Sequence, residues 1–148
     1  MKIFSAILLA VALLFSNFSF AQVASSKVLL GKLQDAQQLL KTGVSYNEFK
    51  PTITEIKLAL GRFEKELGPT GVDSASKFSI FYSSLSKAST KYIGSMRWWN
   101  SAIEDKVKYP DNPDIARMSE IARDGIFEDA SQLVTQAEEA LSKIKQKR

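Results

Sequence analysis

Residues 45–67 read SYNEFKPTITEIKLALGRFEKEL, and this stretch decides the fold. Its apolar residues recur at steps of three and four: Tyr46, Phe49, Ile53, Ile56, Leu60, Phe63 and Leu67. Such spacing places them on one face of an α-helix, in the pattern of a helix-bundle seam. Ser45 and Glu48 have the spacing of a capping box, and Gly68-Pro69 is a strong stop signal. The stretch therefore predicts a helix that begins after Ser45 and buries one face.

The same periodicity extends to both sides of this stretch and predicts three further helices. The first runs from about Ser26 to Lys41, and Gly43 follows as a left-handed cap. The third begins near Asp73 or Ser74 and runs to about Val107. The fourth begins at Pro113, with Asn112 as its N-cap. The apolar series are Leu29, Leu33, Ala36 and Leu40 in the first, Phe78, Phe81, Leu85, Ala88, Tyr92, Met96, Trp99 and Ile103 in the third, and Ile115, Met118, Ala122, Ile126, Ala130, Leu133, Ala137, Leu141 and Ile144 in the fourth.

No segment after the leader shows the strict apolar–polar alternation of a strand, and no Asn-Gly or Asp-Gly turn joins two strand-like runs. Short connections make successive helices antiparallel. We therefore predict an all-α fold, an antiparallel up-down-up-down four-helix bundle with a long C-terminal helical hairpin. Residues 22–148 are expected to form this single domain, which is long enough for a substantial core.

The first 21 residues have the composition of a secretion signal. One cation, Lys2, precedes an apolar run that ends near Phe15, and Ser19 and Ala21 form a small-x-small cleavage site. The run is shorter than the roughly 20 residues that a spanning helix needs. We expect cleavage between Ala21 and Gln22, no transmembrane anchor afterwards, and a periplasmic or secreted protein.

The chain contains no histidine and no cysteine. Their absence excludes Ser-His-Asp and Cys-His catalysis, zinc sites with His or Cys ligands, c-type haem attachment and a ferritin-like di-iron centre with its Glu-x-x-His pairs. A formal net charge of +4 gives no indication of nucleic-acid binding. We expect a protein that is not an enzyme and that carries no cofactor.

Carboxylates are the remaining candidates for chemistry. Glu120, Asp124 and Glu128 share one helical face, a spacing that could bind a hard cation. Arg117 and Arg123 lie within pairing distance on the same helix, so a solvated and partly paired charged face is the preferred interpretation. We therefore predict no metal site.

The most unusual local sequence is Arg97-Trp98-Trp99-Asn100. Successive helical residues point about 100° apart, so the two tryptophans cannot share one narrow seam. Trp99 continues the apolar face, whereas Trp98 lies beside it. Tyr82, next to Phe81, widens the aromatic surface in the same way. Because tryptophan and arginine are enriched in binding hot spots, Arg97, Trp98 and Tyr82 are the candidate binding residues.

These residues support two functional hypotheses. The first is an exported, non-enzymatic helical bundle that binds a partner protein; its oligomeric state stays open. The alternative is a carrier for a small apolar ligand, held in a cavity between the third and fourth helices that Tyr92, Met96, Trp99 and Met118 would line. An exposed Trp98 within an apolar patch larger than a few hundred Å² would favour the first, and an internal pocket of roughly 300 Å³ or more would favour the second.

Overall fold

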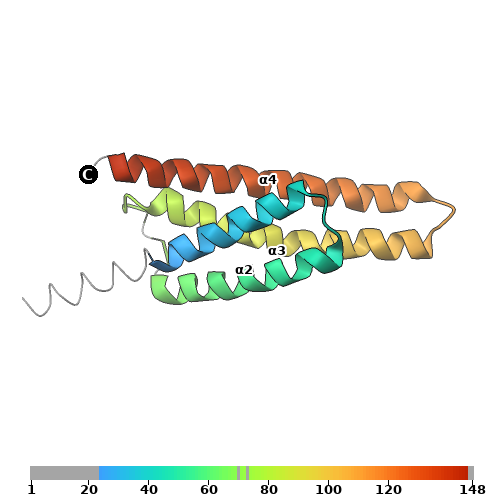
Figure 1. Cartoon of the computed structure of the whole chain (residues 1–148), viewed down its shortest axis with the longest axis horizontal. Coiled ribbons are helices and arrows are strands. Elements are labelled where there is room, and N and C mark those ends of the chain that lie inside the picture. Colours follow the sequence, from blue (N-terminus) through green and yellow to red (C-terminus); the bar gives the residue numbers. More distant parts are fainter. Residues whose placement is uncertain (1–23, 70, 73, 147–148) are drawn as a thin grey trace, which may run out of the picture.

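The computed structural model describes residues 24–69, 71–72 and 74–146. The predicted signal peptide falls outside these residues. The described chain forms four helices, and the predicted all-α fold is confirmed (Figure 1). The helices are an N-terminal helix over residues 24–41, α2 (Tyr46–Leu67), α3 (Ser79–Lys108) and α4 (Pro113–Gln146).

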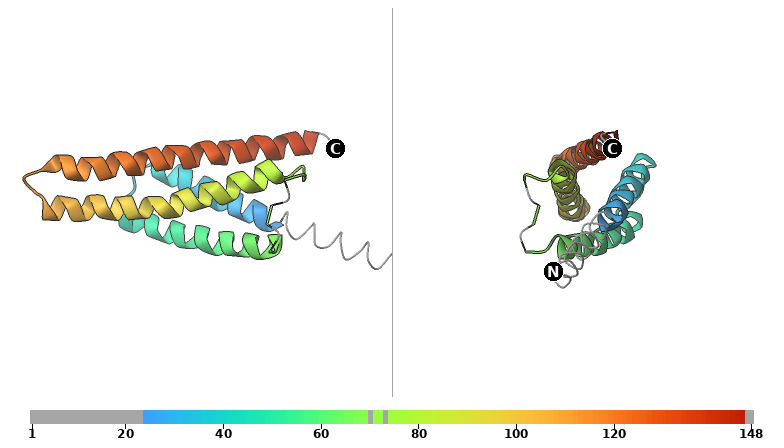
Figure 2. Two further views of the ribbon diagram at one scale, coloured as in Figure 1. Left: turned by 180° about the vertical axis from the view of Figure 1, so that it is seen from behind. Right: turned by 90° about the vertical axis from the view of Figure 1, so that its left-hand side faces the viewer.

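Each helix packs antiparallel to the next, and the N-terminal helix closes the ring against α4 (Figures 1 and 2). Two side-chain hydrogen bonds fix this closing contact. Gln34 Nε2 donates to Glu138 Oε1 at 2.6 Å, and Gln37 Nε2 donates to the Ser131 carbonyl at 3.1 Å. As the residue number rises on the first helix it falls on α4, which is the signature of an antiparallel pair.

Local chemistry sets the helix ends where the sequence predicts them. The Ser45 hydroxyl accepts from the Glu48 amide at 3.4 Å, and the Glu48 carboxylate accepts from the Ser45 amide at 2.8 Å, so the capping box is complete. The Glu48 carboxylate accepts from the Ser45 amide and also, at 2.7 Å, from the Ser45 hydroxyl, and these two hydrogen bonds lower the pKa of Glu48. Gly43 adopts a φ of 77°, which favours glycine, and α4 begins at Pro113.

The start of the third helix differs from its prediction. α3 begins at Ser79, several residues later than Ser74, and residues 74–78 form turns instead. The Ser76 hydroxyl accepts from the Phe78 amide at 3.2 Å. Such a local bond offers the backbone an alternative to the helical pattern, which is why serine-rich segments often delay a helix.

The buried face of α4 agrees with the expected one only in part: Ala130 and Ala137 are buried and Leu133, Leu141 and Ile144 pack against the core, but Met118 is exposed. Its fully packed residues are small: Ala116, Ser119, Ala130, Val134 and Ala137. On α3 the small buried residues are Ser84, Ala88, Ser89, Ser95 and Ala102. Small side chains let two helix backbones approach closely, so alanine and serine accompany the larger apolar residues on the packed faces of α3 and α4.

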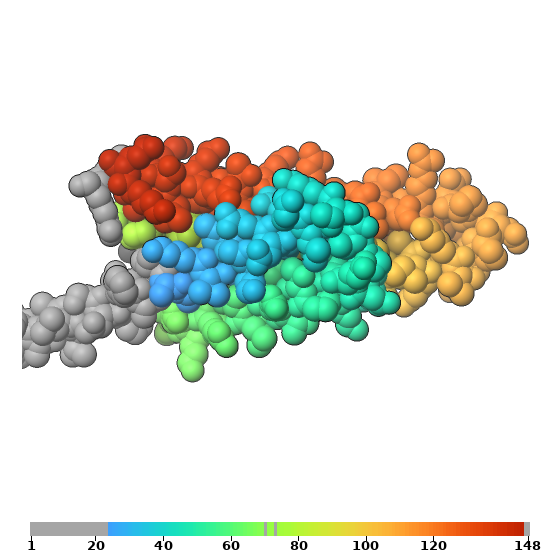
Figure 3. All heavy atoms as spheres, in the orientation of Figure 1, coloured from blue at the N-terminus to red at the C-terminus, as the bar shows by residue number. Residues whose placement is uncertain are grey.

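The C-terminal hairpin, formed by α3 and α4, is longer than the N-terminal one, as the sequence predicts. α3 has 30 residues and α4 has 34, whereas α2 has 22. α3 and α4 therefore continue past the turn that joins the N-terminal helix to α2 (Figures 1 and 3). α2 begins beside Trp99, so residues 100–108 of α3 extend about 14 Å further. We call residues 98–123 the distal hairpin.

The capping box generates a prediction about stability. Replacing Ser45 with Ala should lower the free energy of unfolding by about 1 kcal/mol, because the Glu48 amide loses the hydroxyl that caps it and the Glu48 carboxylate loses the hydroxyl that donates to it. The contribution of Glu48 is present above its unfolded pKa and is lost as pH falls through its lower folded pKa. Chemical denaturation at neutral and acid pH measures both, and the Ser45→Ala difference should shrink in acid.

The control is Thr54→Ala on the same helix, where the exposed hydroxyl bonds only the Lys50 carbonyl. This variant should not destabilise the protein at either pH, because alanine has a higher helix propensity than threonine, and its effect should be the same at both pH values. An equal loss in the two variants would contradict the capping explanation.

Candidate functional site

Four aromatic rings meet where α2 begins, and we call them the aromatic cluster: Phe49, Tyr92, Trp99 and Phe127. Phe49 lies 5.7 Å from Trp99 and 5.6 Å from Phe127 between ring centroids, and Trp99 lies 5.7 Å from Phe127. Two of these pairs are edge-to-face, a favoured geometry for aromatic rings. The cluster joins α2, α3 and α4 and fills the core at this level.

Polar groups bound the aromatic cluster on two sides. The Arg123 guanidinium lies 5.0 Å from the Trp99 ring centroid and also pairs with Asp124 at 2.7 Å. Within the core, the Tyr92 hydroxyl shares a 3.3 Å hydrogen bond with the Ser131 hydroxyl. Burial raises the pKa of Tyr92, and this hydrogen bond opposes part of the rise.

The alternative ligand cavity is not supported by the positions of its four residues. Tyr92 and Trp99 are packed in the aromatic cluster, and Met96 is half-buried against the core. Met118, by contrast, is 72% exposed and points away from the core. The hollows found among the described residues are open to solvent, and Trp99 alone of the four contributes to one of them, a groove of about 610 Å³. The four residues therefore do not surround one space.

Tyr82 belongs to the core and not to a binding surface. It is only 5% exposed and contacts the rings of Phe63, Phe78 and Phe81. It also lies sixteen residues, or about 24 Å along α3, from Trp98. The structure thus separates Tyr82 from the other two candidate binding residues.

Trp98 and Arg97 are both exposed, Trp98 by 42%. The register of α3 against α4 explains the position of Trp98. Ser84 on α3 bonds Gln136 on α4 at 3.1 Å, and Lys91 on α3 bonds Asp129 on α4 at 2.6 Å. The position on α3 thus rises by seven residues while the position on α4 falls by seven. The next step of seven brings Trp98 opposite Ala122. The ring therefore occupies a seam position where the facing side chain is too small to cover it.

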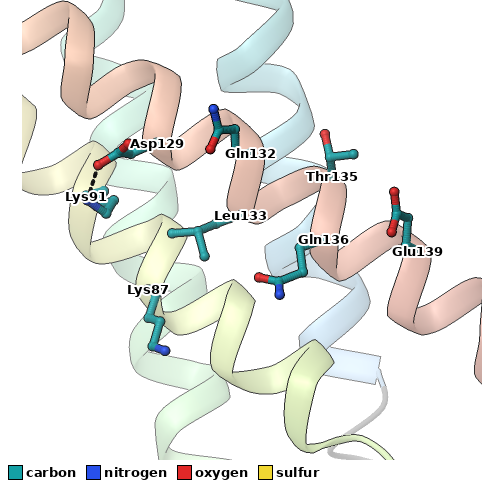
Figure 4. Close-up of a pocket in the computed structure, with 8 residues that line it drawn as sticks. All are labelled: Lys87, Lys91, Asp129, Gln132, Leu133, Thr135, Gln136 and Glu139. Atoms are coloured by element: carbon teal, nitrogen blue, oxygen red, sulfur yellow. Dashed lines mark hydrogen bonds and ion pairs between the residues drawn. The ribbon is translucent and has the colours of Figure 1, made fainter.

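An open groove follows the same side of the seam and holds about 670 Å³ (Figure 4). Its lining carries both signs of charge, with Lys87 and Lys91 on α3 and Asp129 and Glu139 on α4. Figure 4 shows the Lys91–Asp129 ion pair across one end of the groove. Trp98 lies seven residues beyond Lys91 on this same face, so the groove leads toward it.

Exposed apolar side chains concentrate on the distal hairpin. Of the nine large apolar residues that are exposed in the described chain, six lie there: Trp98, Ile103, Val107, Tyr109, Met118 and Ile121. Met118 and Ile121 stand fourteen residues before Gln132 and Thr135, which line the groove. A spacing of two heptads keeps the face of a bundle helix, so both lie on the groove side. We call Arg97, Trp98, Met118 and Ile121 the outer patch.

The sequence-based reasoning missed Ile103, Val107 and Ile121 as exposed apolar residues. It assigned Ile103 to the buried face because the periodicity continues through it. The sequence held one indication of this exposure: the third and fourth predicted helices are longer than the first two.

Two acidic residues in and next to the distal hairpin, Glu120 and Asp124, are engaged in ion pairs. Glu120 contacts Lys106 at 2.6 Å, and this hydrogen bond lowers the pKa of Glu120. Asp124 pairs with Arg123, as described above. Within the described residues, no cluster of acidic side chains has an arrangement that could hold a metal ion.

No family model, curated protein or solved structure matches this chain. Among the described helices, none is both long and apolar enough to cross a membrane. The class that the fold defines is a four-helix bundle with a projecting C-terminal hairpin.

The two tryptophans give a direct test of this arrangement. The Trp98→Phe variant retains only Trp99, whose fluorescence should be blue-shifted and weakly quenched by acrylamide because the ring is packed. The Trp99→Phe variant retains only Trp98, which should emit at longer wavelength and be strongly quenched. Equal quenching in the two variants would contradict the assigned positions.

The aromatic cluster generates a second test. Replacing Phe49 with Ala should cost roughly 3–5 kcal/mol of stability, because it leaves a cavity shared by three helices. The control, Leu58→Ala on the outer side of α2, removes a side chain that is mostly exposed and should change stability by less than about 0.5 kcal/mol. Urea unfolding measures both, and a Phe49→Ala loss as small as the control would show that the cluster is loosely packed.

Proposed function

We propose that this protein is an exported, non-enzymatic helical bundle that binds a partner protein through the outer patch, in the periplasm or outside the cell. The supporting observation is the exposure of Trp98 together with Met118 and Ile121 on one side of the distal hairpin. Exposed apolar residues gathered in one region commonly mark interaction sites.

The groove beside the outer patch supports a protein as the partner. Its side chains offer both signs of charge and several amide and hydroxyl groups: Lys87, Lys91, Asp129, Gln132, Thr135, Gln136 and Glu139. A polar rim next to an exposed aromatic and arginine is the usual composition of a protein interface. A small apolar ligand would instead need an enclosed apolar pocket.

The site chemistry favours binding over catalysis. The chain has no histidine or cysteine, and Glu120 and Asp124 are paired with Lys106 and Arg123. The Ser119 hydroxyl donates to Asp105 at 3.0 Å, but an ordinary carboxylate is too weak a base to activate a serine hydroxyl at neutral pH. The leader sequence supports export, since its apolar run and small-x-small site fit a secretion signal.

The test is capture of partners from the envelope and culture fluid of the producing cells, with the processed protein as bait. Trp98→Ala should lose one specific partner by at least about tenfold, the loss typical of a hot-spot residue. Intact mass of the bait should show the loss of the first 21 residues.

The matched control is Leu58→Ala, which removes an apolar side chain of α2 that is even more exposed than Trp98. It should capture the same partner as the unmodified protein. Equal capture by Trp98→Ala and the unmodified protein would overturn the outer patch as the binding site, and retention of the leader in the exported fraction would overturn the predicted processing.

A further inference from the structure

All four helices reach the end of the bundle that lies opposite the distal hairpin. The N-terminal helix begins there at residue 24, and α2 ends there at Leu67. α3 begins at the same end with Ser79, and α4 ends there with Gln146. The right-hand view of Figure 2 looks at this end of the molecule.

This end carries an excess of positive charge. We count the described residues within about two turns of it, which are residues 24–30, 61–69, 71–72, 74–82 and 139–146. They include three carboxylates, Glu64, Glu66 and Glu139, against six cations. We call the six cations the basic end: Lys27, Arg62, Lys65, Lys77, Lys143 and Lys145. Three further charged residues of the sequence lie outside the described ones: Asp73, Lys147 and Arg148.

The cations of the basic end are available to an external anion. All six are exposed, and within the described residues none of them takes part in an ion pair. The distal hairpin has the opposite balance, because its five carboxylates outnumber its four cations. Two of those four cations, Lys106 and Arg123, are already in ion pairs. Unpaired positive charge is therefore concentrated at one end of the molecule.

The leader joins the chain at the basic end. The N-terminal helix begins at residue 24, and only Gln22 and Val23 separate it from the predicted cleavage point. The inference below rests on the export that we propose above. During export, an apolar leader in the membrane holds the residues that follow it close to the membrane surface. The basic end is therefore the part of the bundle that meets this surface first.

We propose that the basic end binds the anionic phospholipid surface of the membrane across which the protein is exported. Lysine and arginine are attracted to such a surface, and clusters of roughly four to eight of them are typical of this contact. The bundle then stands with its distal hairpin away from the lipid. Trp98 lies about 28 Å along α3 from Ser79, so the outer patch stays clear of the membrane and open to its partner.

The arrangement of the six cations suits a broad flat surface. They come from four segments that surround the end of the bundle: the N-terminal helix, α2, the turns before α3, and α4. A small anion would need several donors that converge on one point, and a linear polyanion would need a row of cations along one side. The face of a bilayer can instead meet all four segments at once.

Vesicle sedimentation of the processed protein, residues 22–148, tests the proposal. These residues contain all four helices and leave out the leader, which would itself enter lipid. The protein should bind vesicles that contain phosphatidylglycerol and should not bind vesicles of phosphatidylcholine alone. About 1 M salt should release it, because the Debye length then falls to about 3 Å.

Removal of charge locates the contact. The test variant replaces three cations of the basic end with glutamine: Lys65→Gln, Lys77→Gln and Lys143→Gln. It should weaken binding to the anionic vesicles at least tenfold, since each cation near such a surface contributes about fivefold in affinity. The control variant removes the same charge from exposed lysines that lie more than about 20 Å away along their helices: Lys41→Gln, Lys50→Gln and Lys108→Gln. The control should bind normally, and circular dichroism should show both variants folded.

The tryptophans test the orientation. Lipids brominated in their acyl chains should not quench Trp98 or Trp99, because both rings stand far from the basic end. Trp98→Ala should bind vesicles as well as the unmodified protein does. The test variant should still capture the partner of the outer patch. Loss of lipid binding alone therefore contradicts this proposal and leaves the proposed function standing.

Three outcomes would overturn the proposal. The first is the absence of any preference for phosphatidylglycerol vesicles, including a protein that binds no vesicles at all. The second is equal weakening by the test and control variants, which would show that only the net charge matters. The third is quenching of Trp98 by brominated lipid, which would place the outer patch, and not the basic end, on the membrane.

Discussion

The aromatic cluster at the start of α2 is the constraint on which the rest of the structure depends. Phe49, from α2, reaches Tyr92 and Trp99 on α3 and Phe127 on α4. These large side chains fill a wide core at one level, where the first two helices reach their connecting turn. Beyond that level, within the described residues, α3 and α4 pack only against each other. The cluster thus divides the molecule into a complete bundle and a two-helix projection.

The projection remains helical because its contacts are local to the α3–α4 pair. Small residues, among them Ala102, Ala116 and Ser119, let the two backbones approach closely. The Lys106–Glu120 ion pair and the Ser119–Asp105 hydrogen bond add polar contacts across the seam. Close packing of small side chains cannot cover larger ones, so Trp98, Val107 and Met118 stay exposed. The exposed apolar surface is a direct result of how this pair is held together.

Much of the fold could be predicted from the sequence because it depends on short-range patterns. Ser45 and Glu48 define the start of α2, and Pro113 defines the start of α4. Tyr82 was assigned wrongly to a surface because it neighbours Phe81, and a narrow seam cannot hold both. A bundle helix with neighbours on two sides buries a wide arc, and both rings fit within it. Met118 was assigned wrongly to a core cavity because the periodicity continues through it, whereas it lies on the groove side of α4, which stays open to solvent.

The surroundings of the two sides of the distal hairpin differ for a geometric reason. The outer patch lies on the side of the α3–α4 pair that the open groove follows, one heptad beyond Lys91. Trp98 is exposed there because the side chain that faces it is small. Ile103 lies on the other side, beside the start of α2, and Val107 follows one turn later. These two side chains are exposed because α3 continues past the helices that cover its earlier turns, so small facing residues expose one side and unequal helix lengths expose the other.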